Sequence, residues 1–244
     1  TEGLDVYNAN MRGPKCSAWE GGTRAFSFWH WPTNWQPKVL GNLTAHLDIL
    51  PTLCELAGAK IPQSLKPKLD GHSLVPLLES VDNIDNFHEN RILFHHVARW
   101  PSGLAHLHKY AMAGARQGNF LLLRSNHCGN PECLKYMSQC MALRAIEKGR
   151  TVHTYSNGTA QFHWGLSPAD HWALYNVKKD PGCQSNLVNK RPELVKTLSN
   201  AYENWWDQTY PQMIAMGGDL GGPDQGRKAA KRDKEWRGVK IDKK

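Results

Sequence analysis

The sequence predicts an α/β fold: the end of an α/β domain, then a smaller subdomain in which an antiparallel sheet packs against a helix. Two helical patterns and an apolar strand pattern fall before residue 80. Short strand patterns separated by turn signals follow, and a long helical pattern comes after them. We therefore expect the end of the α/β domain over 1–80, the antiparallel subdomain over 81–216, and a Gly-rich, then basic tail over 217–244.

The first region contains three predicted elements after an N-terminal loop. Residues 23–31 are rich in aromatic residues and precede a proline, which predicts a buried strand. Residues 48–58 predict a helix, in which Asp48 caps the first turn and Gly58 provides a left-handed stop. A second short, capped helix is predicted over 73–78.

The second region alternates strand and turn signals before its helix. Four strands are predicted, over 92–97, 109–116, 119–124 and 172–177. The dipeptide Gln117-Gly118 indicates a hairpin between the second and third strands. Pro192 then opens a helix that is predicted to run to about Trp206, because proline suits the first helical position.

The positive charge of the chain is concentrated in its tail. The 244 residues have a net charge of +8, and residues 227–244 hold nine Lys or Arg against three Asp or Glu. Such a tail could bind an anionic polymer, but a solvated end is the simpler interpretation, and no nucleic-acid partner is expected. No run of about 18 apolar residues occurs, so no membrane span is expected. Because the chain starts at Thr1 without a methionine, we expect it to be a fragment or a processed product.

Two groups of side chains could bind ligands outside any motif. His127 with Cys128, Cys133 and Cys140 is compatible with zinc, but the spacing favours a disulfide-tied insertion, and we predict no metal site. A second group contains histidines and one lysine near the predicted strands: His95, His96, His106, His108 and Lys109. Of these, His106, His108 and Lys109 are candidates for binding an anionic substrate, although for any single one a surface position without function is the alternative.

Four motifs occur in order along the chain. Residues 12–24 read Arg-Gly-Pro-Lys-Cys-Ser-Ala-Trp-Glu-Gly-Gly-Thr-Arg, and an apolar segment ending in Trp-Pro follows them. Residues 48–58 contain Asp-x-x-Pro-Thr and end in Ala-Gly, and residues 70–78 read Asp-Gly-His-Ser-Leu-Val-Pro-Leu-Leu. Residues 174–187 contain Leu-Tyr-Asn, Asp-Pro-Gly and Asn-Leu. In order and spacing these motifs resemble the C-terminal part of formylglycine-dependent sulfatases (arylsulfatase-like, of the alkaline-phosphatase-like superfamily), over about residues 1–210.

The resemblance implies a role for each charged residue of the first motif. Lys15 matches the lysine that contacts the sulfate group, and a lysine offers a compact positive charge on a flexible stem. Arg12, Glu20 and Arg24 match motif positions that shape the loop around that lysine. Sulfatases hydrolyse sulfate esters through a formylglycine nucleophile and a divalent cation, usually calcium. We therefore expect a sulfated small molecule or glycan as the substrate, and a periplasmic or secreted location.

The sequence departs from the family pattern at two points. Cys16 stands where the family has glycine after the lysine. The nucleophile motif Cys/Ser-x-Pro/Ala-x-Arg and the Asp or Asn pairs that bind calcium are absent from the 244 residues. We expect the formylglycine and the calcium ligands to lie outside this sequence, and the chain alone to be inactive. Two alternatives stay open: part of a phosphoesterase or phosphonate hydrolase of the same superfamily, and a module that binds anionic polymers through its tail.

Overall fold

The computed structural model describes residues 7–13, 17–66, 69–80, 84, 87–96, 103–125 and 172–217. The chain forms two compact units. One, which we call the sheet unit, comprises Thr1–Arg24 and Phe94–Lys244, and the other, the helical unit, comprises Ala25–Leu93. This division differs from the predicted boundary near residue 80, because the segment around Trp19 packs into the core of the sheet unit.

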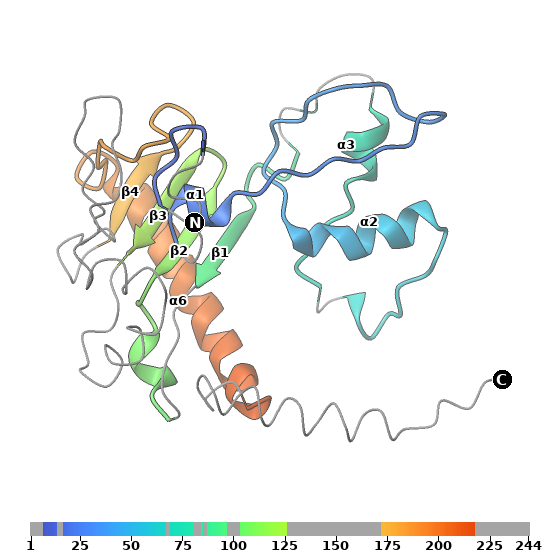
Figure 1. The fold of residues 1–244 in the computed structure, drawn as a ribbon. Helices are drawn as coiled ribbons and strands as arrows, with labels where there is room; N and C mark the ends of the chain where they lie inside the picture. The colour runs from blue at the N-terminus through green and yellow to red at the C-terminus, as the bar shows by residue number, and fades with distance from the viewer. Residues whose placement is uncertain are drawn as a thin grey trace. The chain divides into compact units, whose positions relative to one another are not determined.

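The sheet unit is built on four strands in the order β1-β2-β3-β4 (Figure 1). These are β1 (Ile92–His96, which begins in the helical unit), β2 (Ala113–Gln117), β3 (Phe120–Arg124) and β4 (Ala173–Asn176). The pairs β2–β3 and β3–β4 are antiparallel. Gln117 opposes Phe120 across a two-residue turn, and Gly118 has a φ of +50°, so the predicted hairpin is confirmed.

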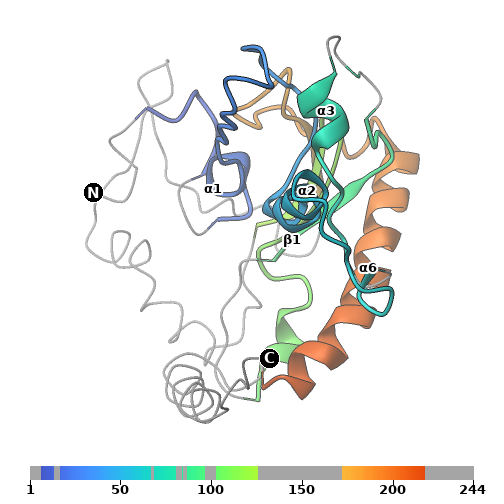
Figure 2. The ribbon, with the colours of Figure 1, turned by 90° about the vertical axis from the view of Figure 1, so that its right-hand side faces the viewer.

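One long helix, α6 (Pro192–Ala215), covers this sheet and packs on β2 and β3. Figure 2 shows it as a continuous rod beside β1. The helix starts at the predicted proline but runs nine residues beyond Trp206, through Pro211. Its buried residues are Leu198, Tyr202 and Trp206, which recur at helical spacing and face the sheet.

The core of the sheet unit also receives the N-terminal segment. Trp19 immediately precedes the short helix α1 (Glu20–Thr23) and packs with Leu121, Leu123 and Tyr175, with its ring centroid 5.6 Å from that of Tyr175. The predicted strand over 109–116 begins only at Ala113, since the 3₁₀ helix η3 (Ala105–His108) and a turn precede it.

The helical unit contains η1 (His46–Asp48), α2 (Ile49–Leu56) and α3 (Val75–Glu79). Its core is formed by apolar side chains of α3 and the residue before it, against which aromatic residues of the surrounding loops pack: Leu74, Leu77, Leu78, Trp29, Trp35 and Phe87. Both helices lie where the sequence predicts them, and Gly58 has the expected positive φ, +63°.

Two sequence predictions for the helical unit are wrong. The strand predicted over 23–31 is not formed: Thr23 ends α1, and a strand needs a neighbour for its backbone groups, whereas no described segment forms a ladder with residues 25–30. Asp48 makes no cap bond to the first turn of α2. Its carboxylate is turned instead toward Arg91. None of the helices within the described residues is long and apolar enough to cross a membrane.

Candidate functional site

The described residues of the motif over 12–24 belong to the sheet unit, and the two ends of the motif loop are joined to each other. The backbone N–H of Gly21 donates to the carbonyl of Arg12 at 2.8 Å, which joins the two ends of the loop. A Cβ atom on Gly21 would lie 2.1 Å from the carbonyl oxygen of Gly13, so a side chain cannot be accommodated there without a shift of backbone. Gly13 itself has a φ of +88°, a conformation that other residues rarely adopt. The two motif glycines therefore allow the loop to close.

Arg12 fixes the start of this loop to the turn that follows β4. Its guanidinium lies 3.9 Å from the centre of the Trp19 ring, and its Nη1 donates to the carbonyl of Cys183 at 3.1 Å. The Arg12 backbone N–H donates to the carbonyl of Pro181, also at 3.1 Å. The turn is ordered in its own right, because the Asp180 carboxylate accepts backbone N–H groups from the residues that follow it. The first and fourth motifs, distant in the sequence, thus form one structure.

Glu20 fixes the end of the loop to the sheet. Its carboxylate is buried and accepts a hydrogen bond from Nη1 of Arg116 on β2 at 2.8 Å. Nη1 of Arg24 lies 3.9 Å from the same carboxylate, but the Arg24 side chain is largely exposed, so this ion pair contributes little to the stability of the loop. Sequence reasoning missed Arg116, which belongs to no motif and is separated from Glu20 by 96 residues.

Lys15 lies outside the described residues, as does Cys16 beside it. The residues that flank this gap, Gly13 and Ser17, are described, and Ser17 is buried. What the structure describes is therefore the frame of the loop, held at one end by Arg12 and at the other by Glu20.

The structure does not bring the predicted anion-binding group together on one surface. His108 is fully buried and His106 is exposed, although both belong to η3. Burial opposes the charge of Lys109, but hydrogen bonds to Glu203 and Asp207 of α6 outweigh burial and raise its pKa. The positive charge of Lys109 is thereby compensated within the protein.

The neighbouring histidines of β1 are neutral near pH 7. Burial, with a smaller contribution from Arg116, lowers the pKa of His95 to about 4. Burial also lowers the pKa of His96, whose Nε2 lies 2.8 Å from the carbonyl oxygen of His108. These imidazoles therefore support the fold without adding positive charge.

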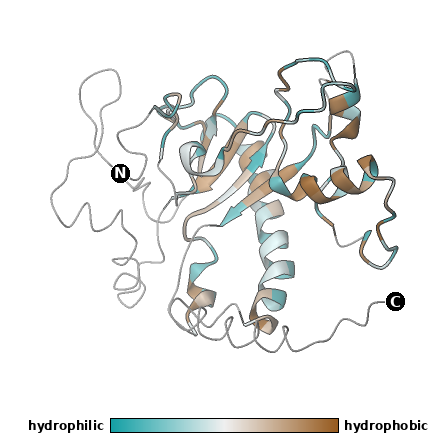
Figure 3. Cartoon of the chain, turned by 45° about the vertical axis from the view of Figure 1, so that its right-hand side comes forward, coloured by the Kyte–Doolittle hydropathy of each residue, from teal (hydrophilic) through white to brown (hydrophobic). Residues whose placement is uncertain are grey.

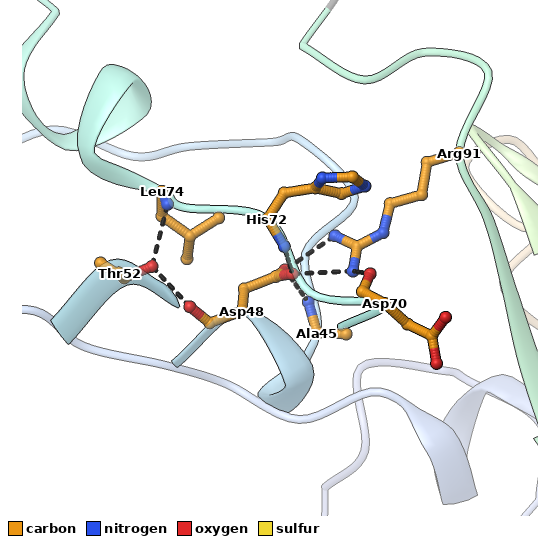
Figure 4. A network of polar contacts seen from close by, with 7 residues as sticks. All are labelled: Ala45, Asp48, Thr52, Asp70, His72, Leu74 and Arg91. Atoms are coloured by element: carbon orange, nitrogen blue, oxygen red, sulfur yellow. Dashed lines mark hydrogen bonds and ion pairs between the residues drawn. The ribbon is translucent and has the colours of Figure 1, made fainter. Parts of the chain in front are cut away.

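A second polar centre lies in the helical unit and joins the second and third motifs (Figure 4). The Asp48 carboxylate accepts two hydrogen bonds from the guanidinium of Arg91, at 2.7 and 2.8 Å. It also accepts the backbone N–H groups of Ala45 at 2.8 Å and His72 at 2.9 Å. Burial by itself would raise the pKa of Asp48, but these hydrogen bonds outweigh burial and hold the pKa below its ordinary value.

Thr52 extends this centre to the start of α3. Its hydroxyl donates to the carbonyl of Asp48 and accepts the backbone N–H of Leu74 at 2.9 Å. The motif residues Asp48 and Thr52 therefore hold the Asp-Gly-His-Ser-Leu segment in place, and Arg91 completes the pairing from 43 residues away. No pattern in the sequence singles out Arg91, because its partner is distant along the chain.

The part of the chain that the structure describes offers no metal site, since none of its His, Cys, Asp and Glu residues form a group of three or more suited to an ion. The calcium implied by the resemblance therefore has no ligand set among these residues. His127 and the three cysteines that follow it lie outside the described residues, so their interpretation stays a prediction.

The chain is similar to curated sulfatases, whereas no protein-family model matches it. It is 43% identical to human arylsulfatase A over 203 residues, which cover 77% of this chain and 31% of that protein. Human arylsulfatase D is 38% identical over 105 residues, covering 40% of this chain and 17% of that protein. Mouse steryl-sulfatase is 36% identical over 111 residues, covering 43% and 17%. The chain thus spans less than a third of the length of each of these relatives.

A solved structure shares the fold. The structure comes from a study of how Bacteroides thetaiotaomicron metabolises multiple glycosaminoglycans. The match covers 80% of this chain and 32% of the chain in that structure, with a TM-score of 0.50 and 19% sequence identity. The resemblance to sulfatases that the four motifs indicated is confirmed: the chain is related to the sulfatases. Its relatives are sulfuric ester hydrolases, named arylsulfatases and steryl-sulfatase.

Proposed function

We propose that this chain forms one wall of the active site of a sulfatase, in which Lys15 binds the sulfate group of a sulfated glycan or aryl sulfate. One observation carries the proposal: the described residues on the two sides of Lys15 are joined to each other, with Arg12 held to the turn after β4 and Glu20 held to Arg116 of β2. Flanks fixed in this way lose little conformational freedom when a ligand binds between them. That is the property a binding loop for a small anion needs.

The chemistry proposed for Lys15 is electrostatic. A sulfate ester carries negative charge on its oxygens, and more charge reaches the departing oxygen as the S–O bond breaks. An ammonium group held beside those oxygens stabilises that charge. Arg12 and Glu20 position the loop, because their side chains contact protein groups, whereas Arg24 is largely exposed and contributes little to that position. For Lys109 we propose a structural role in place of an anion-binding one, because α6 supplies its two acidic partners.

We propose further that the formylglycine nucleophile and the calcium ligands lie outside these 244 residues. A nucleophile motif is absent from the sequence, and the described residues offer no metal site. The chain alone is then expected to hydrolyse no sulfate ester, and turnover by the purified chain would contradict this. We also propose that the protein works in the periplasm or outside the cell, as the family resemblance implies.

A phosphoesterase of the same superfamily is the principal alternative. Every relative reported above is a sulfatase, which favours sulfate over phosphate as the anion. Binding of an anionic polymer by residues 227–244 is the other alternative, and it predicts affinity that falls steeply with salt and disappears when those residues are deleted.

The test of the proposal is the affinity of the purified chain for 4-nitrophenyl sulfate, measured by NMR titration. We expect Lys15→Ala to weaken binding about tenfold or more, which corresponds to about 1.4 kcal/mol or more. The matched control is Lys178→Ala, which removes an exposed lysine of the same unit and should leave the affinity unchanged. Equal affinities for wild type and Lys15→Ala would overturn the assignment of Lys15, and tighter binding of 4-nitrophenyl phosphate would favour the phosphoesterase.

A further inference from the structure

Two histidines of the helical unit lie face to face. The rings of His72 and His88 are stacked, with centroids 4.0 Å apart and an angle of 18° between their planes. His72 belongs to the third motif, and His88 belongs to the segment 87–91 that leads into β1. Phe87 packs edge-on against the His88 ring, with 4.3 Å between centroids. This stack, which we call the histidine pair, joins two segments that meet only in the folded chain.

The Asp48 carboxylate brings these two segments together. Its Oδ1 accepts the backbone N–H of His72 at 2.9 Å, and both of its oxygens accept hydrogen bonds from the guanidinium of Arg91. The Arg91 backbone N–H donates in turn to the carbonyl of His88 at 2.8 Å. The backbone on both sides of the ring stack is thus tied to one carboxylate, so the rings cannot separate without disturbing these hydrogen bonds.

The backbone of His88 has a conformation that a contact must maintain. Its φ is +48°, in the left-handed region that residues other than glycine adopt uncommonly. The stacked ring and the hydrogen bond from Arg91 are the contacts that stabilise this turn. Strained turns persist only while the surrounding structure holds them, so a weaker stack favours release of the segment 87–91.

The charged groups that face His72 come from three segments. Burial lowers the pKa of His72, and the neighbouring His88 and Arg91 lower it further, whereas Asp48 and Asp70 oppose this shift without reversing it. Figure 3 shows α2, the helix that follows Asp48, as largely apolar along its length, so this helix adds little charge near the pair. The His72 ring is therefore neutral near pH 7.

We propose that the histidine pair is an acid-sensitive switch of the helical unit, which is stacked near neutral pH and separates at about pH 5, releasing the segment 87–91. His88 is exposed, so a proton reaches it without rearrangement of the chain. Protonation of both rings then places two positive charges about 4 Å apart beside Arg91, and separation of the rings relieves their repulsion.

The direction of the pH effect follows from the lowered pKa of His72. Because this pKa lies below the ordinary value of 6.5, the contribution of the neutral His72 ring to stability is complete above about pH 6.5 and is lost as the pH falls through the lowered pKa. The Asp48 carboxylate stays ionised at pH 5, since its pKa is held below 3.8. None of these groups belongs to the first motif, so the proposal stands apart from sulfate binding by Lys15.

The experiment is hydrogen exchange of the full 244-residue chain, measured by mass spectrometry on peptides that cover residues 69–75 and 87–93. Exchange rates at about pH 7.5 and about pH 5 are corrected for the intrinsic pH dependence of amide exchange, so that they report the opening of each segment. We expect the opening constant of both segments to rise about fivefold or more at the lower pH.

Two variants separate the charge of the pair from its packing. His72→Phe keeps a ring that can stack but cannot be protonated, so its opening constant should be the same at both pH values. His88→Asn removes the neighbouring charge with a residue that tolerates a positive φ, so it should reduce the pH dependence and raise the pKa of His72 in an NMR titration. The matched control is His30→Gln, at an exposed position of the same unit, which should keep the pH dependence of the wild type.

Circular dichroism at about pH 7.5 checks that each variant is folded, and the titration of His72 in the wild-type chain tests the pair without any substitution. Any of three results would overturn the proposal. The first is equal opening of the wild-type segments at both pH values. The second is an acid-induced rise in His72→Phe as large as that in the wild type. The third is an equal rise in peptides of the β2–β3 hairpin, which would show that acid acts on the whole chain rather than on the histidine pair.

Discussion

Replacing Arg91 with alanine tests whether the Asp48 centre holds the helical unit together. The Asp48 side chain is fully buried, at 0% exposure, and that of Arg91 is 5% exposed. Arg91 supplies two of the four hydrogen bonds to the carboxylate and its only ion-pair partner among the described residues. Arg91→Ala therefore leaves a buried negative charge with backbone N–H groups alone.

The expected loss of stability is large. Breaking a buried ion pair by removing one partner costs about 3 to 5 kcal/mol, because the remaining charge stays desolvated. A small domain has a total stability of roughly 5 to 15 kcal/mol. Since Asp48 also orders His72 through its backbone N–H, the variant should lose most of the structure that links α2 to α3.

The assay is urea unfolding read by hydrogen-exchange mass spectrometry on peptides that cover residues 45–56, which reports the helical unit by itself. Lys60→Ala, at an exposed position of the same unit, should change stability by less than about 0.5 kcal/mol. The double variant Asp48→Ala with Arg91→Ala should be less destabilised than Arg91→Ala, because no charge is left behind. A loss below about 1 kcal/mol for Arg91→Ala, or a double variant less stable than it, would refute the reasoning.

The same centre predicts how stability depends on pH. The pKa of Asp48 is held below its ordinary value of 3.8. The contribution of this carboxylate to the stability of the helical unit is therefore fully present above about pH 4 and is lost as the pH falls through the lowered pKa. In Arg91→Ala the buried carboxyl keeps its desolvation without the arginine, and its pKa should rise. The difference in free energy of unfolding between the wild type and Arg91→Ala should therefore be greatest at neutral pH and shrink as the pH falls.

Three further predictions concern the sheet unit. Gly21→Ala should destabilise the motif loop by more than about 1 kcal/mol and weaken sulfate binding, because the added Cβ would lie 2.1 Å from the carbonyl oxygen of Gly13. Gly41→Ala is the control: a Cβ there would have no atom within 4 Å, so neither the stability nor the sulfate affinity should change. Arg116→Ala should lower the free energy of unfolding in urea by on the order of 3 kcal/mol, because it leaves the buried Glu20 carboxylate without its main partner. Arg24→Ala should lower it by less than about 0.5 kcal/mol. Equal effects of the two substitutions would contradict the role given to Arg116. The lowered pKa of His95 makes its stabilising contribution complete above the ordinary value of 6.5 and lost as the pH falls toward about 4. His95→Gln should therefore reduce the change in the free energy of unfolding between these pH values by on the order of 3 kcal/mol. An unchanged pH dependence would count against burial of this imidazole.

Local patterns in the sequence determined the helices and turns of this protein. The α2 and α6 helices and the β2–β3 hairpin lie where spacing, proline and glycine predict them. These elements are formed by residues within a few positions of one another, so a single sequence contains the information. The motif order determined the relation to sulfatases for the same reason, since it needs no contact between distant residues.

The tertiary structure alone decided which residues hold those elements together. The pairs Glu20–Arg116 and Asp48–Arg91 join residues 96 and 43 positions apart, and no local pattern marks Arg116 or Arg91. Asp48 shows the limit directly: its position before a helix predicts a cap, but a buried guanidinium is a stronger partner for its carboxylate.

Segment 25–30 shows the converse case. Its residues have strand character, yet the strand is not formed among the described residues, because a strand is stabilised by a neighbour that its own sequence cannot provide. The sequence by itself determined which segments can become helices, turns or strands. The tertiary structure decided which of them find a partner, because ion pairs, sheet ladders and buried faces are made between residues that are distant along the chain.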